Sequence, residues 1–283
     1  MFKYGISCSL EPQPKSAPTH HYGDIETTCA EIKRAGYDAI ELFIRDAKQY
    51  DANRINAAMS AAGLDGCCAI CTGMEYTKNH LCLISEDPAN RRAAIDALKA
   101  HIDLGAQIGG APVVVGIIRG SIPDMSKKDM YLGWYKDALN ELCDYGKSSG
   151  VDIFVESIMR YINNYLNSVP EAAQFLRDMK RDNLFLHIDT HSMNVEDNDE
   201  YVRVYDAMDI IGYVHFSDSD RLYPGGGNID FAPTMQALVD GGYKGYISTE
   251  CWPRPSEFEC AKRGLDFCKG LELLCRVNPE IDE

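Results

Sequence analysis

The chain has 283 residues, of which 45% are hydrophobic and 25% are charged, and its formal net charge is −15. This composition is typical of a globular protein with a large core, while the negative charge argues against nucleic acid and anionic membrane as partners, because both require a basic surface. No apolar run reaches the roughly 18 residues that span a bilayer, and the first residues, MFKYGISCSLEPQP, lack the order of a signal peptide; we therefore expect a cytoplasmic protein.

Apolar runs alternate with amphipathic stretches along the whole sequence, which is the pattern of alternating strands and helices. The expected strands are 2–8, 37–42, 64–70, 111–118, 151–156, 184–189, 210–215 and 245–250. The expected helices are 23–35, 52–62, 88–108, 127–147, 170–180, 200–208, 231–241 and 256–275. Gly36, Gly63, Gly150 and Gly242 stand where glycine commonly ends a helix. Such alternation implies parallel strands, and its length favours an α/β fold, a single (β/α)8 TIM barrel domain over residues 1–283.

Three other features have a simpler interpretation. No GxGxxG motif follows an early strand, so a dinucleotide-binding fold is not expected. The chain has 11 cysteines, which we expect to be reduced; Cys67, Cys68 and Cys71 lie in an expected strand interior without a second CxxC, so we interpret them as core residues. The acidic segment 195–200 lacks the spacing of a calcium loop and is expected to be a solvated loop.

Four polar residues close the last four expected strands: Glu156, Asp189, His215 and Glu250. The carboxyl ends of parallel barrel strands form the face where active sites are built. Any one of the four would be explained as a helix cap or an ion-pair partner, but together they form a set of metal-ligand type. Three carboxylates and one imidazole suit a divalent ion such as Mn²⁺, Mg²⁺, Co²⁺ or Zn²⁺.

Such an ion can polarise a carbonyl or hold the two oxygens of an enediolate. A carboxylate beside it can move a proton on the neighbouring carbon. Glu156 and Glu250, facing each other across the ion, would serve opposite faces of one carbon, as an epimerisation requires.

Further polar groups are expected at the same face of the barrel. Arg221, His191, Arg119 and Arg160 follow strand ends and are candidate ligands for a substrate hydroxyl, carboxylate or phosphate, with loop ion pairs as the alternative. Trp252 follows the eighth strand and is a candidate wall for a sugar, with plain packing as the alternative.

Other histidines and one further glutamate are expected to have lesser roles. Glu41 is expected to form hydrogen bonds inside the barrel mouth, and His187, two residues before Asp189, is either a group behind the ligands or a packed core histidine. Surface or capping roles are expected for His20, His21, His80 and His101.

The motifs as a set resemble a known family. GYDAIEL at 36–42, Glu156, the Asp-Thr pair at 189–190, VHFSD with Arg221, PGGGNIDF at 224–231 and GYKGYISTE at 242–250 resemble the xylose-isomerase-like TIM-barrel superfamily, with the ketose 3-epimerase group as the nearest pattern. The resemblance implies that Glu156, Asp189, His215 and Glu250 bind Mn²⁺ or Co²⁺, with Mn²⁺ first. It implies that the two glutamates are the acid–base pair, that Arg221 contacts a small carbohydrate, and that the chain forms homo-oligomers.

The sequence departs from that group in its expected sugar contacts. The epimerases read E-P-x-N-R-x-E after the fifth strand, whereas this chain has Ile162 in place of the second glutamate. They also read D-T-x-H-M-N, and here the histidine has either moved by one position, to His191, or been replaced by Ser192. The metal set is kept while the sugar contacts differ, which fits a changed substrate, a changed reaction or a lost one.

The sequence therefore favours a divalent-metal-dependent sugar isomerase or epimerase. A lyase on the same scaffold, dehydrating inososes or cleaving C-glycosides with a partner subunit, begins with the same proton abstraction and stays open. A non-catalytic sugar-binding accessory subunit is the third alternative, against which the intact ligand set argues. Cleavage of damaged DNA is not expected at a charge of −15.

Overall fold

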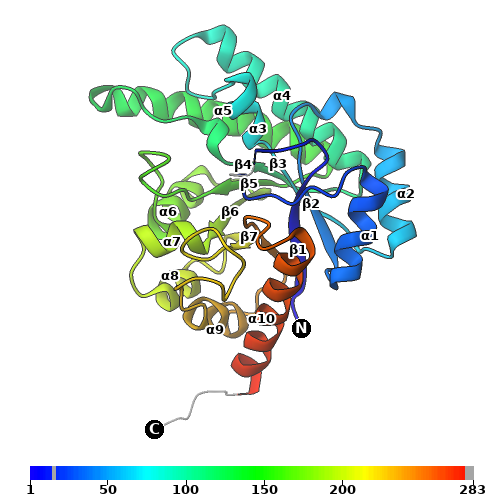
Figure 1. Ribbon diagram of the computed structural model, residues 1–283. Helices are drawn as coiled ribbons and strands as arrows, with labels where there is room; N and C mark the ends of the chain where they lie inside the picture. The colour runs from blue at the N-terminus through cyan, green and yellow to red at the C-terminus, as the bar shows by residue number, and fades with distance from the viewer. Residues whose placement is uncertain (15–16, 278–283) are drawn as a thin grey trace.

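The computed structural model describes residues 1–14 and 17–277. Within them, parallel strands close into one barrel in chain order, with β1 paired to β8, and the helices surround it (Figure 1). The strands are β1 Lys3–Ser9, β2 Ala39–Phe43, β3 Gly66–Cys71, β4 Val113–Val115, β5 Ile153–Glu156, β6 Leu184–Asp189, β7 Ile211–Phe216 and β8 Tyr246–Thr249. The predicted α/β fold, a (β/α)8 TIM barrel, is confirmed.

All of the predicted helices are present, each end within two residues of its expected position. The helices are α1 Ile25–Ala35, α2 Ala52–Ala62, α3 Gly73–Asn79, α4 Pro88–Gln107, α5 Lys128–Ser149, α6 Val169–Met179, α7 Thr190–Glu196, α8 Glu200–Asp206, α9 Ala232–Asp240 and α10 Glu257–Val277, with short 3₁₀ turns at Ala47–Gln49, Ile117–Arg119 and Met125–Lys127. Among the described residues, no helix has the length and apolar character needed to cross a membrane.

The glycines expected at helix ends have the conformation that ends a helix. Gly36 and Gly150 cap α1 and α5 with φ of 103° and 70°, which a residue with a Cβ adopts only under strain. Gly63 and Gly242 also have positive φ, so the expectation is confirmed at each position.

Two loop regions differ from the sequence prediction. The fourth strand was expected to run to residue 118, but it ends at Val115 because the chain turns at Gly116 into a 3₁₀ turn. The acidic segment 195–200 is not a solvated loop throughout, because it ends α7 and begins α8. Its Asp197 accepts a hydrogen bond from the Val169 amide at 3.2 Å, so the segment also fixes the start of α6.

The barrel interior changes character along its axis. Its lower part is an apolar plug of Ala39, Cys68, Ala69, Val114, Phe154 and Tyr213. Two residues further along three of these strands stand Glu41, Glu156 and His215. Because alternate residues of a strand share a face, the polar groups lie directly above the plug at the carboxyl ends. The predicted strand position of Cys67, Cys68 and Cys71 is confirmed, and all three are free thiols.

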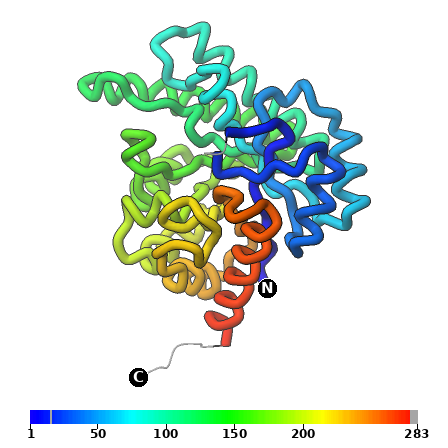
Figure 2. Tube along the Cα trace, viewed as in Figure 1, coloured from blue at the N-terminus to red at the C-terminus, as the bar shows by residue number. Residues whose placement is uncertain are grey.

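The last helix secures the first strand at the rim of the barrel. Figure 2 shows the amino-terminal segment beside the final helix. The Glu272 carboxylate on α10 is fully buried and accepts hydrogen bonds from the Phe2 amide at 2.7 Å and the Tyr4 hydroxyl at 2.9 Å. The side chain of Arg276 donates to the same carboxylate at 2.7 Å.

Replacement of Glu272 by alanine leaves the Phe2 amide without an acceptor and the Tyr4 hydroxyl with only the longer bond to the Cys268 carbonyl at 3.4 Å, and each lost bond costs about 1–3 kcal/mol. We expect Glu272→Ala to lower the free energy of unfolding in urea by about 2–4 kcal/mol. Glu259→Ala, on the exposed face of the same helix, is the control and should change stability by less than about 0.5 kcal/mol. Equal effects of the two substitutions would show that Glu272 does not secure the first strand.

Candidate active site

The four strand-end residues meet at one end of the barrel. Glu156 and Asp189 are the last residues of β5 and β6, His215 lies in β7, and Glu250 directly follows β8. Asp189 is paired in register with His215, and the Glu250 amide donates to the Phe216 carbonyl. Burial is almost complete for Asp189, His215 and Glu250. Adjacent parallel strands therefore place these side chains around one point, as the strand-end pattern predicted.

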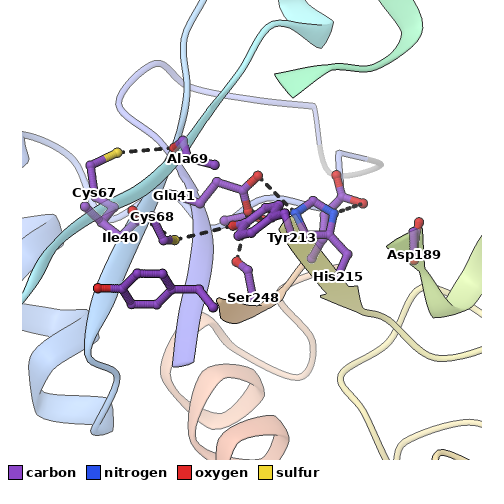
Figure 3. A network of polar contacts seen from close by, with 12 residues as sticks. Ile40, Glu41, Cys67, Cys68, Ala69, Asp189, Tyr213, His215 and Ser248 are labelled. Carbon is purple, nitrogen blue, oxygen red and sulfur yellow. Dashed lines mark hydrogen bonds and ion pairs between the residues drawn. The ribbon is translucent and has the colours of Figure 1, made fainter. Parts of the chain in front are cut away.

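The imidazole of His215 is oriented from behind by Glu41. Its Nε2 lies 3.0 and 2.9 Å from the two Glu41 oxygens (Figure 3). Glu41 also accepts hydrogen bonds from Ser7 at 2.7 Å and Ser248 at 2.9 Å, so its expected role inside the barrel mouth is confirmed. The other ring nitrogen, Nδ1, has no hydrogen-bond partner and lies 3.7 Å from a Glu250 oxygen.

This arrangement is the one a metal-binding histidine commonly has, with one nitrogen on a carboxylate and the other directed at the ion. Burial opposes protonation of His215, but the carboxylates of Glu41 and Glu250 raise its pKa well above the ordinary value. A protonated imidazole carries a proton on each ring nitrogen. A cation bound at Nδ1 would replace the proton there.

The two glutamates of the site differ in protonation. Burial, and then repulsion from Glu250 and Asp189, raises the pKa of Glu156 to about 8. Burial also opposes ionisation of Glu250, but attraction to Arg221 and His215 lowers its pKa to about 2. Near neutral pH, one carboxyl therefore holds a proton and the other does not, which is the arrangement of an acid–base pair.

The guanidinium of Arg221 lies between two of the carboxylates. Its Nη1 is 2.9 Å from Asp189 Oδ2 and 2.7 Å from Glu250 Oε2. Asp189 Oδ1 is already occupied, because it accepts from the His191 amide at the start of α7. An ion bound to Asp189 would therefore use Oδ2 and release Arg221 toward the cavity.

The site has the donors and the charge that a divalent ion requires. The carboxylates of Asp189 and Glu250 are buried and share one guanidinium, with the half-buried Glu156 beside them, and buried charges need compensation. Oxygen donors with one imidazole suit Mn²⁺, Co²⁺, Mg²⁺ or Zn²⁺. Glu156, His187 and His215 bring one donor atom each to within 4.8 Å of one another. These residues and the unpartnered His215 Nδ1 fit such an ion.

His187 belongs to the site more closely than the sequence indicated. Its ring lies 4.1 Å from that of His215, and neither ring nitrogen has a hydrogen-bond partner. Burial, followed by repulsion from His215 and Arg221, holds its pKa well below the ordinary value, so the ring is neutral. The signal available in the sequence was its spacing of two residues from Asp189, which puts both on the inner face of β6.

The loop after β7 is organised by Asp218, a residue that the sequence analysis did not single out. Asp218 accepts hydrogen bonds from the amides of Gly225 at 2.9 Å and Ile229 at 3.0 Å. A Cβ on Gly227 would lie 2.3 Å from its carboxylate, which explains why the glycine-rich stretch is needed there. The same loop holds Arg221 in a left-handed conformation with φ of 58°. The compact loop thereby fixes the arginine that faces the carboxylates.

Two of the expected substrate ligands are corrected by the structure. Arg119 is fully buried, and its guanidinium donates to the carbonyls of Glu156 at 2.6 Å and Tyr165 at 3.0 Å, so it holds the β5–α6 loop. Arg160 forms an ion pair with Glu196 at 2.5 Å and does not line the cavity. Both guanidinium groups thus have protein partners, backbone carbonyls for Arg119 and the Glu196 carboxylate for Arg160.

His191 and Trp252 occupy different surroundings. His191 Nδ1 contacts the Asp218 carbonyl at 2.9 Å, so one nitrogen of the ring is engaged by the β7 loop. Trp252 lines the cavity beside Glu250, and its amide donates to the Arg221 carbonyl at 2.7 Å. This backbone hydrogen bond joins the loop after β7 to the segment after β8, and both border the cavity.

A cavity of about 540 Å³ opens above the carboxylates. Glu156, Glu250 and Arg221 form its floor, and most of its wall is apolar. The apolar wall residues include Phe43, Met74, Ile117, Ile158, Ile162 and Trp252. Ile162, which stands where the resembled family has a glutamate, is therefore a cavity residue.

The comparisons with known proteins agree with this architecture. The profile of the family described as xylose isomerase-like TIM barrel matches residues 29–271. The chain belongs to this family. An L-ribulose 3-epimerase of Methylomonas sp. (strain DH-1) is 31% identical over 240 residues, which cover 82% of each chain.

Two further similar proteins are also epimerases. A 3-dehydro-D-guloside 4-epimerase of Escherichia coli (strain K12) is 26% identical over 228 residues, covering 77% of this chain and 84% of the relative. A solved structure of an L-ribulose 3-epimerase superposes with a TM-score of 0.84 at 26% identity and covers 100% of both chains. These proteins are similar to this chain along most of its length.

Gly116 offers a test of how closely the site is packed. A Cβ at this position would lie 2.7 Å from Glu156 Oε2, so Gly116→Ala must displace the carboxylate. We expect the fold to be kept and the affinity for Mn²⁺, measured by calorimetry, to fall about 10- to 100-fold, as for other changes around metal ligands. Gly133→Ala, where a Cβ meets nothing within 4 Å, is the matched control. Unchanged Mn²⁺ affinity in Gly116→Ala would remove Glu156 from the ligand set.

Proposed function

We propose that this chain is a divalent-metal-dependent sugar epimerase that inverts a carbon next to a carbonyl. The observation that carries the proposal is the geometry of the two glutamates: Glu156 and Glu250 line one cavity, Glu156 lies beside His215, and Glu250 is paired with Arg221. The similarity to epimerases that act on ketoses and keto-glycosides supports it.

The proposed ligands are Glu156, Asp189, His215 and Glu250, with Mn²⁺ as the first candidate and Co²⁺, Mg²⁺ or Zn²⁺ as alternatives. When bound, the ion would supply Lewis-acid polarisation of the substrate carbonyl. Arg221, released from Asp189, would face the substrate oxygen on which negative charge develops. Trp252 and His191 are proposed to border the bound sugar.

The protein groups then carry the proton in two steps. Glu250, ionised, takes the proton from the carbon beside the carbonyl, and the bonding electrons pass into the enediolate. Glu156 delivers a proton to the opposite face of the same carbon. The configuration inverts without net change in composition, and the reverse reaction uses the two glutamates in exchanged roles.

The cavity wall favours a substrate with an apolar portion. Ile158, Ile162 and Trp252 line the cavity, and aromatic and aliphatic side chains pack against apolar surface. A substituted keto-sugar, such as a glycoside, fits this wall better than a free ketose with hydroxyls on every carbon. The same wall keeps lyase chemistry on a glycoside as the second candidate, because elimination begins with the same proton abstraction.

We also propose the partners, the oligomeric state and the cellular compartment of the enzyme. A small carbohydrate is the partner, and a homo-oligomer is expected by analogy with the resembled family. The cysteines of the described residues are free, which fits a reducing compartment such as the cytoplasm.

The direct test is exchange of carbon-bound hydrogen in deuterated water. Ketoses and 3-keto-glycosides would be incubated with the Mn²⁺-loaded protein and followed by nuclear magnetic resonance. We expect deuterium at the inverted carbon and an epimeric product, with Glu250→Gln and Glu156→Gln each reducing kcat by at least about 100-fold. Glu259→Gln, on the exposed face of α10, is the control.

The outcomes separate the candidates. An unsaturated or cleaved product would favour the lyase, while exchange at the wild-type rate in Glu250→Gln would contradict the assigned base. Absence of exchange with every keto-sugar, despite bound metal, would favour a binding subunit.

Metal binding should depend on pH, because a ligand must lose its proton before it binds an ion. Two proposed ligands must lose a proton: Glu156, whose pKa is raised to about 8, and His215, whose pKa is raised well above its ordinary value. Mn²⁺ affinity is therefore expected to rise by more than about tenfold per pH unit between about pH 5 and pH 8 and to continue rising above pH 8. Calorimetry at several pH values measures this, and Glu156→Gln should reduce the pH dependence.

The stability of the metal-free protein should fall as the pH rises, whereas the metal affinity should increase. The folded state holds the Glu156 proton more tightly than the unfolded chain, whose carboxyl has the ordinary pKa of 4.5. Stability is therefore lost as pH rises from about 4.5 to about 8. A metal-free protein whose melting temperature is constant across this range would contradict the protonation assigned to Glu156.

A further inference from the structure

A second group of metal-ligand type lies outside the candidate active site. His20, Cys251 and Cys260, which we call the thiol–imidazole cluster, bring one donor atom each to within 4.8 Å of one another. All three residues are buried, with exposed fractions of 0%, 0% and 1%. The expected surface or capping role of His20 is therefore wrong. Its cysteine partners lie more than 230 positions away in the sequence, so a local sequence pattern does not reveal them.

The three residues come from separate parts of the fold. His20 lies in the segment between β1 and α1, Cys251 follows β8, and Cys260 is on the first turns of α10. Figure 2 shows the blue β1–α1 segment near the orange beginning of α10. The backbone of His20 is fixed by hydrogen bonds to Ser7 and Ser9 of β1, at 2.9 and 2.8 Å. Cys260 is thus held by a helix, and His20 by backbone hydrogen bonds to a barrel strand.

The distances suit a small thiophilic ion. The sulfurs of Cys251 and Cys260 are 3.3 Å apart, and His20 Nε2 is 3.8 Å from the Cys251 sulfur. In a tetrahedral zinc site with Zn–S bonds of about 2.3 Å, neighbouring ligand atoms are about 3.5–3.8 Å apart. An ion therefore fits among the three donors with small side-chain adjustments.

The far side of the imidazole has the second partner that metal-bound histidines commonly have. His20 Nδ1 lies 2.9 Å from a Glu257 carboxylate oxygen and 3.3 Å from the Tyr22 hydroxyl. A carboxylate on one ring nitrogen directs the other nitrogen at the ion. Here Nε2 is the nitrogen that faces the sulfurs.

We propose that His20, Cys251 and Cys260 form a second metal site, selective for a thiophilic divalent ion and in particular Zn²⁺. Thiolate ligands favour Zn²⁺, whereas the carboxylate-rich active site favours harder ions. With three protein donors, one position of a tetrahedral ion is left for a fourth ligand such as a buried water.

The proposed site is connected to the active site by the chain itself. Pro18 and Thr19, which line the active-site cavity, immediately precede His20. Glu250 immediately precedes Cys251. Zinc at the cluster would join the cavity-lining β1–α1 segment to the strand end that carries Glu250, and would thereby stabilise one wall of the cavity.

The test uses Co²⁺ in place of Zn²⁺, because thiolate-bound Co²⁺ has a near-ultraviolet charge-transfer band that oxygen and nitrogen ligands do not produce. The full-length protein, reduced and freed of metal by a chelator, is titrated with Co²⁺ and then with Zn²⁺. We expect the band to appear and then to disappear as Zn²⁺ displaces Co²⁺. Cys260→Ser should abolish the band, while Cys143→Ser, a buried cysteine of α5, should retain it.

Further measurements keep the proposal falsifiable if Cys260→Ser does not fold. The wild-type protein alone must show the band, and its absence at saturating Co²⁺ overturns the proposal. Mass spectrometry after alkylation would detect a Cys251–Cys260 disulfide in protein purified under reducing conditions, and a disulfide would also overturn it. His215→Ala must retain the band even though it lacks the proposed active-site ligand, so this inference and the proposed function fail independently.

Discussion

The accumulation of buried negative charge at the barrel mouth is the constraint on which the rest of the site depends. Glu156, Asp189 and Glu250 converge at the base of the cavity, and burial with mutual repulsion raises the pKa of Glu156 to about 8. The guanidinium of Arg221 and the imidazole of His215 offset part of that charge. A divalent ion is the natural complement of the remainder, and the unpartnered Nδ1 of His215 is directed where such an ion would bind.

The fold makes this arrangement tolerable by separating apolar and polar groups along each strand. The inner faces carry Phe154 and Tyr213 below and Glu156 and His215 above, two residues further on. The apolar plug stabilises the barrel. The layer above it can therefore hold the charged groups of Glu41, Glu156 and His215. Support from outside the layer is specific: Glu41 orients His215, and Asp218 shapes the loop that carries Arg221.

Much of the fold and of the candidate site could be predicted from the sequence, because both depend on the spacing of apolar residues and on the order of the strands. The strands, the helices and the convergence of the last four strand ends follow from local patterns. The roles of Arg119 and His20 could not be predicted, because each is set by contacts with distant segments: carbonyls of the β5–α6 loop for Arg119, and Cys251 with Glu257 for His20. The short helices α3 and α7 were also missed, since one or two turns carry too little periodicity.

The central claim is that one divalent ion is held by Glu156, Asp189, His215 and Glu250, and a crystal of the protein soaked in Mn²⁺ tests it most directly. Anomalous scattering measured at the manganese absorption edge locates the ion without reference to any assumed ligand. The account predicts one strong peak within bonding distance, about 2.0–2.3 Å, of all four side chains, with the Arg221 guanidinium moved away from Asp189. A peak bound instead to Glu156, His187 and His215, or no peak at this end of the barrel, would contradict it.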